Sequence, residues 1–221
     1  MIYITGDLHG DISRFSAPAM RRLRKGDTLI VCGDFGFVWD GSAKEQKLLK
    51  KIGAKPYTVL FLDGCHENFD LLKEYPVTDW KGGRAQVISG NLVHLMRGQL
   101  YTLEGYRFFT FGGGESREYD LRDGAKTWWE EEMPSLEEYQ EALANLERVN
   151  WTVDCVLTHC APSGVVQKIN PSYGTDELTD FLEMVSQRCK FAYWFFGHYH
   201  ENRIIDQKYI LQWEKISELG F

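Results

Sequence analysis

The chain opens with MIYITGDLHG (residues 1–10), and a similar pattern returns in TLIVCGD (residues 28–34). In both stretches an apolar run ends in a Gly-Asp pair. Such a run predicts a buried β-strand, and the glycine marks the turn that ends it. Helical stretches follow at Asp11–Lys25 and Ser42–Ile52, and a third apolar run lies at Tyr57–Asp63. The first third of the chain therefore predicts strands that alternate with helices, and uniformly apolar strands indicate a sheet covered on both faces.

The composition predicts one folded domain over residues 1–221. Of the 221 residues, 43% are hydrophobic, which is enough to fill a core. The net charge is −7, so we expect no binding of long nucleic acids and no attraction to an anionic membrane. The longest apolar runs are far shorter than the roughly 20 residues of a transmembrane helix. Five cysteines without a CxxC pair, and no secretory signal, predict a cytoplasmic protein without disulfides.

The rest of the chain mixes short strands with helices. Residues 84–112 contain four short strand-like runs that predict an antiparallel meander. Residues 115–134 form a polar insertion of a length typical of a functional loop or lid. Ser135 and Glu138 predict a capping box at the start of a helix. A strand at 153–158, a helix at 175–188, a strand at 192–196 and a closing hairpin over 202–213 complete the prediction.

Five polar clusters each follow one of these strands directly. The carboxyl ends of strands in such a sheet form the ligand crevice, so we expect the clusters to converge in space. Residues two apart share one face of an extended segment, which lets Asp7 with His9, and His198 with His200, bind within one site. Two aspartates and four histidines beside glycines suit Mn, Fe or Zn. The clusters are GDLHG (6–10), GD (33–34), GCHE (64–67), TH (158–159) and GHYH (197–200).

This ordered series resembles the motifs of the calcineurin-like metallophosphoesterase family, GDxHG, GD, GNHE, H and GHxH, over residues 6–200. The resemblance implies an α/β (α+β) fold in which two packed mixed β-sheets are flanked by helices, a four-layer sandwich. It also implies two divalent metal ions at the strand ends and hydrolysis of a phosphoester by a metal-bridging hydroxide. Carried over by motif, Asp7, His9 and His200 would hold one metal, His159 and His198 the other, and Asp34 would bridge them.

Two positions of the third motif carry further expectations. His66 matches the family histidine that contacts the phosphoryl group or protonates the leaving oxygen, and with Asp34 it is the expected catalytic residue. An imidazole suits this role because it exchanges protons near neutral pH. Cys65 stands where the family has asparagine as a ligand of the second metal. Ligation by a thiolate would favour zinc or iron over manganese, move the second metal, or reduce activity; alternatively, Cys65 does not bind and the second site is weak.

Substrate contacts are expected from the insertion and from the third motif. Arg117 and Arg122 would reach a second phosphate, or would pair with the local acidic run. Trp128 or Trp129 would stack on a base, or would pack the insertion onto the core. Asn68 follows the metal motif and is a candidate substrate contact. Glu67 is expected at a helix start.

The predicted function is hydrolysis of phosphomonoesters or small phosphodiesters, with nucleotide-like small molecules as the preferred substrates. Phe35-Gly36-Phe37 after the second motif, in place of DRG, argues against protein phosphatase activity. The alternative is a metal-binding scaffold or interaction protein in which Cys65 has weakened catalysis. A cysteine-dependent phosphatase is disfavoured, because Gly64-Cys65-His66-Glu67 has a carboxylate where that chemistry needs an arginine.

Overall fold

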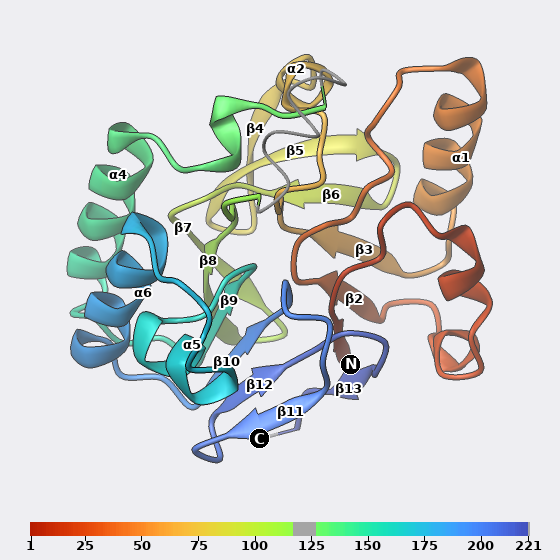
Figure 1. Cartoon of the computed structure of the whole chain (residues 1–221). Helices are drawn as coiled ribbons and strands as arrows, with labels where there is room; N and C mark the ends of the chain where they lie inside the picture. The colour runs from red at the N-terminus through yellow and green to blue at the C-terminus, as the bar shows by residue number, and fades with distance from the viewer. Residues whose placement is uncertain (117–126, 221) are drawn as a thin grey trace.

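Two mixed β-sheets lie against each other, with helices on both outer sides (Figure 1). The computed structural model describes residues 1–116 and 127–220. Within these residues the first sheet has seven strands in the order β13-β1-β2-β3-β6-β5-β4, and the second has six in the order β11-β12-β10-β9-β8-β7. The predicted α/β class with two mixed sheets flanked by helices is confirmed. The prediction of one domain over the whole chain stays a prediction.

The first sheet is built around the two Gly-Asp strands. Strands β1, β2, β3 and β6 run parallel, whereas β4, β5 and β13 are antiparallel to their neighbours. Helix α1 (Ala43–Gly53) follows β2, and the Ser42 hydroxyl caps it by accepting from the amide of Glu45. The strands of this sheet are β1 (Ile2–Thr5), β2 (Thr28–Val31), β3 (Thr58–Phe61), β4 (Val77–Trp80), β5 (Gly83–Ser89), β6 (Leu92–Leu95) and β13 (Ser217–Glu218).

The second sheet has parallel strands at its centre. Strands β8, β9, β10 and β12 are parallel, and β7 and β11 pair antiparallel with β8 and β12. Its helices are α4 (Leu136–Arg148), α5 (Ser163–Ile169) and α6 (Glu177–Arg188), which lie together on its outer side (Figure 1). The strands are β7 (Gln99–Leu103), β8 (Tyr106–Phe111), β9 (Cys155–Thr158), β10 (Tyr193–Phe196), β11 (Arg203–Ile205) and β12 (Tyr209–Leu211).

The uniformly apolar strands have hydrophobic partners on both faces. In the first sheet Ile4 and Leu60 belong to a core cluster that contains Phe108 and Leu157 of the second sheet, so this cluster lies between the sheets. The alternate residues, such as Leu29, join a second cluster with Leu49 and Ile52 of α1. A third cluster joins the outer face of the second sheet to α4 and α6. Burying each such side chain stabilises the fold by roughly 1.5–3 kcal/mol.

Two sequence predictions about secondary structure are wrong. The stretch Asp11–Lys25 is not one helix but contains two short 3₁₀ helices, Ile12–Ser16 and Met20–Arg22. Pro18 lacks an amide hydrogen and disfavours helical backbone at Ala17, whose ψ is 146°.

The predicted antiparallel meander over 84–112 is divided between the two sheets. β5 and β6 complete the first sheet, and β7 and β8 begin the second. Helix α5, β4 and β13 have no counterpart in the prediction, and a short helix α2 (Phe69–Lys73) begins two residues after Glu67, where a helix start was expected. The predicted closing hairpin is confirmed as β11 and β12, and so is the capping box of Ser135 and Glu138 at the start of α4.

A buried ion pair fixes the strand ends to the carboxyl-terminal part of the insertion. The Arg97 side chain, 4% exposed, donates from Nε to Asp63 Oδ2 at 2.7 Å. Its Nη2 donates to the carbonyl of Glu131 at 2.7 Å, and its Nη1 lies 3.2 Å from Glu138 Oε2. His94 Nε2 lies 3.1 Å from the other Asp63 oxygen. Arg97 therefore holds the short 3₁₀ helix Glu130–Glu132 against the first sheet.

Candidate metal centre

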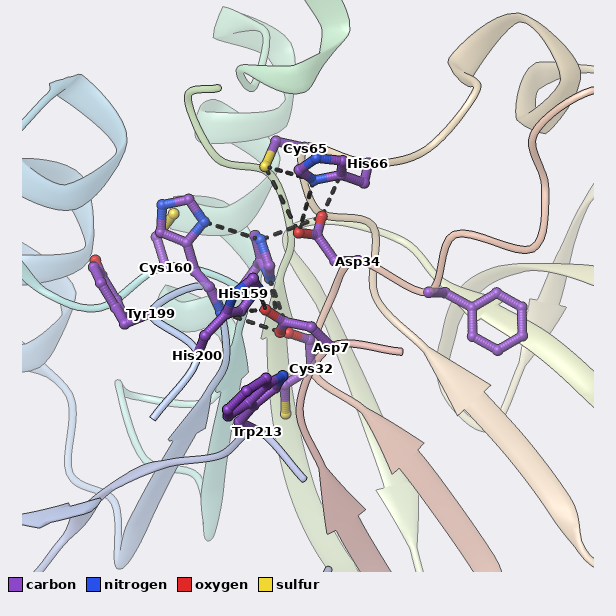
Figure 2. A network of polar contacts seen from close by, with 12 residues as sticks. Asp7, Cys32, Asp34, Cys65, His66, His159, Cys160, Tyr199, His200 and Trp213 are labelled. Carbon is purple, nitrogen blue, oxygen red and sulfur yellow. Dashed lines mark hydrogen bonds and ion pairs between the residues drawn. The ribbon is translucent and has the colours of Figure 1, made fainter. Parts of the chain in front are cut away.

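The five polar clusters lie at the carboxyl ends of five parallel strands, β1, β2, β3, β9 and β10. Each strand ends in a sharp turn that brings its polar side chains toward the junction of the two sheets (Figure 2). Four of these residues have a left-handed backbone, with φ of 47° at His9, 45° at Asp34, 69° at His198 and 49° at His200. This conformation is costly for non-glycine residues and is concentrated at functional sites.

The first group of metal-ligating side chains consists of Asp7, His9 and His200, whose ligand atoms lie within 4.8 Å of one another. His9 Nε2 is 2.9 Å from His200 Nε2, and Asp7 Oδ2 is 3.1 Å from His200 Nε2 and 3.9 Å from His9 Nε2. Ligands bound about 2 Å from a shared cation lie about 3–4 Å apart. The spacing of this group therefore fits one metal ion.

The second group consists of Cys65, His159 and His198, again with ligand atoms within 4.8 Å of one another. His159 Nε2 and His198 Nδ1 are 3.2 Å apart. The other nitrogen of His159, Nδ1, is held by the carbonyl oxygen of Cys32 at 3.0 Å. That contact fixes the ring so that Nε2 faces the group.

Asp34 lies between the two groups. Its Oδ1 is 3.4 Å from His159 Nε2, and its Oδ2 is 3.7 Å from His9 Nε2. Figure 2 shows dashed contacts from this carboxylate toward the Cys65–His66 turn and toward His159. The carboxylate thus reaches both groups: Oδ1 faces His159, whereas Oδ2 faces His9 and also lies 3.7 Å from Cys65 Sγ. A carboxylate shared by two cations must lie between both groups in this way.

The charges of the site are strongly coupled. Burial opposes ionisation of Asp34, yet His159 and His66 hold the pKa of this carboxyl well below its usual value. Burial likewise opposes protonation of His159, but the Asp34 and Asp7 carboxylates raise its pKa to about 10. The hydrogen bond to Asp7 raises the pKa of His200, whereas burial lowers that of His9. Asp34 is therefore an anion at neutral pH, and the site favours positive charge.

His66 points toward the same carboxylate. Its Nδ1 lies 3.0 Å from Asp34 Oδ2, and its backbone amide donates to Asp34 Oδ1 at 2.8 Å. Its ring lies edge-on to that of His9, with centroids 4.7 Å apart. The contact at Nδ1 orients the ring, so Nε2 is the nitrogen available to a bound molecule.

Glycines allow the close approach of these chains. A Cβ on Gly64 would lie 2.2 Å from Asp34 Oδ1 and 2.8 Å from His159 Nε2. A Cβ on Gly197 would lie 2.1 Å from Asp7 Oδ1. All three distances are far below van der Waals contact, so any side chain at either position would displace a candidate metal-ligating group.

A cavity of about 290 Å³ opens beside the two groups. Asp34, His66 and His200 contribute to its wall, so a molecule bound there would meet the polar cluster directly. The other lining residues are Cys65, Glu115, Ser116, Tyr173, His198 and Tyr199. The volume is near the lower end of the range for small-molecule sites.

A family model described as calcineurin-like phosphoesterase matches residues 1–202 of the chain. The chain belongs to this family. Membership indicates metal-dependent hydrolysis of phosphoester bonds, and the resemblance deduced from the five motifs is confirmed. A search of curated proteins found no significant match to the chain.

The side chains of the site fit the divalent metals that calcineurin-like phosphoesterases use. Asp7 and Asp34 are 1% and 2% exposed, and buried carboxylates are costly unless cations compensate them. Imidazole nitrogens, carboxylate oxygens and one sulfur converge on two neighbouring points. This donor chemistry suits Mn, Fe or Zn. The number and identity of the metals, and the ligand role of each residue, stay predictions.

Other predicted residues are placed away from these groups or engaged elsewhere. Asn68 caps α2 through Oδ1, which accepts from Leu71, and its Nδ2 donates to the carbonyl of Trp39 at 2.7 Å. Its predicted substrate contact gains no support from these bonds. Trp129 packs against Trp39 and donates to Asp70, as expected if it fixes the insertion. Arg117 and Arg122 lie outside the described residues.

Three supporting residues hold the candidate ligands in place through contacts that the sequence does not predict. Glu67 is fully buried and accepts from the amides of Phe35 at 2.6 Å and Gly36 at 3.3 Å, so it fixes the turn after Asp34 rather than a helix start. Trp213 stacks on His200 with ring centroids 5.4 Å apart. Arg14 donates from Nη1 to the carbonyl of Asp7 at 3.0 Å. Glu67 is the last residue of the third motif, GCHE, and this position in a motif is the local signal that points to it.

None of the described helices is long and apolar enough to cross a bilayer.

Proposed function

We propose that this protein is a dinuclear metal-dependent phosphoesterase that hydrolyses phosphomonoesters or small phosphodiesters, with nucleotide-like molecules as preferred substrates. The position of Asp34 carries the proposal, because its carboxylate lies between two groups of candidate metal-ligating side chains, with Oδ1 near His159 and Oδ2 near His9. Asp7, His9 and His200 would hold one cation, and Cys65, His159 and His198 the other. Bound divalent cations would polarise the phosphoryl group and activate water for the attack.

The chain itself supplies proton transfer and orientation. His66 lines the cavity and is oriented through Nδ1 by Asp34. When the P–O bond breaks, the leaving oxygen needs a proton, and Nε2 of protonated His66 would donate it. Asp34 would hold the ring in this orientation through its contact with Nδ1.

The size and charge of the molecule favour small substrates. A cavity of about 290 Å³ admits a phosphorylated small molecule or one end of a somewhat longer molecule. The net charge of −7 gives no broad attraction for a long polyanion.

The test is to load chelator-treated protein with Mn, Fe or Zn, then to measure metal content and hydrolysis of p-nitrophenyl phosphate and bis-p-nitrophenyl phosphate. Nucleoside phosphates follow as natural-type substrates. Asp34→Asn should lower the rate by more than about 100-fold, the upper end of losses at supporting residues of metal sites. Asp206→Asn, which changes an exposed carboxylate that pairs with Lys168, is the matched control.

The results separate this function from the alternative of a metal-binding scaffold. Turnover that depends on both metal and Asp34 supports the phosphoesterase. Stoichiometric metal binding without turnover of any of these esters would overturn it and favour the scaffold.

A further inference from the structure

We propose that Cys65 is a thiolate ligand of the second metal and makes that position selective for zinc or iron over manganese. The first position has harder ligands, which are oxygen and nitrogen atoms only. This inference deepens the proposed function and rests on its two-metal site. It concerns the one motif position where the chain departs from the family pattern.

The structure places Cys65 as a ligand would be placed. Its side chain is 3% exposed, and Sγ belongs to a group with His159 and His198 in which all ligand atoms lie within 4.8 Å of one another. Sγ is also 3.7 Å from Asp34 Oδ2. One sulfur and two imidazole nitrogens thus surround a common point, and the Asp34 carboxylate lies beside them, with Oδ2 near Cys65 and Oδ1 near His159. Thiolate, imidazole and carboxylate are the donors found in zinc sites.

The turn that carries Cys65 is held in place on both sides. Gly64 leaves no room for a side chain beside Asp34 and His159, so the backbone approaches them closely. The next amide, of His66, donates to Asp34 Oδ1 at 2.8 Å. Because of these constraints, Sγ already points toward His159 and His198 in the folded chain, and no rearrangement of the loop is needed.

The two groups differ in the kind of donor they offer. Asp7, His9 and His200 supply one carboxylate and two imidazoles, and with Asp34 they present oxygen and nitrogen only. Oxygen-rich sites accept manganese, whereas a thiolate selects softer metals such as zinc and iron. A single substitution within the motif would therefore give the two positions different metal preferences.

Cobalt(II) provides a direct spectroscopic test. Chelator-treated protein is titrated with Co²⁺ while near-ultraviolet absorption and bound cobalt are recorded. A thiolate-to-cobalt charge-transfer band should appear with the unmodified chain and be lost in Cys65→Asn and Cys65→Ser. Cys189→Ala is the matched control, because Cys189 is also buried but its Sγ contacts only the carbonyl of Lys190 among the contacts described.

Competition between metals tests the selectivity. The preference for Zn²⁺ over Mn²⁺ at the second position should fall by about tenfold or more in Cys65→Asn, because the soft ligand is replaced by an amide. Circular dichroism of each variant confirms that it is folded. If Cys65→Asn does not fold, Cys65→Ser replaces it in this measurement.

The outcomes distinguish this inference from the proposed function. If two cobalt ions bind without a charge-transfer band, or if the band survives in both Cys65 variants, thiolate ligation is overturned while phosphoester hydrolysis can still stand. If the band is present and depends on Cys65, but no ester is hydrolysed with any metal, the ligation holds and the proposed function fails. Failure to bind any cobalt overturns both.

Discussion

Replacing Arg97 with methionine should destabilise the fold by about 3–5 kcal/mol, because it leaves a buried carboxylate without its cation. The side chains of Arg97 and Asp63 are 4% and 2% exposed, and the guanidinium joins them by a bond of 2.7 Å from Nε. Burial raises the pKa of Asp63, but Arg97 and His94 outweigh it and hold that pKa well below its usual value. The carboxylate is therefore charged at neutral pH and depends on this partner.

Urea unfolding measures the loss. With a urea dependence of about 3 kcal/mol per M, a loss of about 3–5 kcal/mol lowers the midpoint by about 1 to 1.7 M. Lys168→Met is the matched control: it breaks the exposed pair with Asp206 and should leave the urea midpoint almost unchanged, because exposed ion pairs contribute little.

A double variant identifies the cause. Asp63→Asn combined with Arg97→Met leaves neither charge buried alone, so its cost should be smaller than the sum of the two single losses. A loss below about 1 kcal/mol for Arg97→Met, or strict additivity in the double variant, would refute the reasoning.

Three further results are expected. His66→Ala should lower kcat by about 10²- to 10⁴-fold on an alkyl phosphoester and much less on a p-nitrophenyl ester, whose leaving group needs no proton; equal losses on both would contradict the acid role. Glu67→Ala removes the acceptor of the Phe35 and Gly36 amides and should lower metal affinity or activity by about 10- to 100-fold. Glu67→Gln should restore part of the loss, and metal titration and kcat measure both effects. The ion pair of Asp63 stabilises the fold above the usual carboxyl pKa of about 4, and this stability is lost as the pH falls toward the lower pKa of Asp63 in the folded protein. The melting temperature of Asp63→Asn should therefore fall less steeply with decreasing pH than that of the unmodified protein.

Much of the fold and of the site was predictable because it depends on local sequence. Apolar runs of β-branched residues gave the parallel strands, and Gly-Asp and His motifs directly after them had to meet at one edge of the sheets. The capping box at Ser135 is equally local. Each of these features is determined by residues that are close together in the sequence.

The remaining features depend on contacts between distant parts of the chain. Glu67 bonds to amides about thirty positions away in sequence, and Trp213 stacks on His200 from a loop after β12. The third motif contains Glu67 but does not reveal its partners, and Trp213 has no periodic or motif signal. The failed helix at 11–25 is different, because Pro18 already marked the break. The division of the meander between two sheets follows from packing of the whole core, which no single hairpin reveals.

The left-handed backbone at four of the proposed metal ligands has a consequence for variation of this protein. Each such residue costs of order 1–3 kcal/mol unless it is glycine. His9, Asp34, His198 and His200 all adopt this conformation. Glycine at any of them would relax the chain and remove a ligand, so a selection for thermostability alone would erode the centre first. Directed evolution of this protein must therefore retain an activity or metal-binding screen at every round.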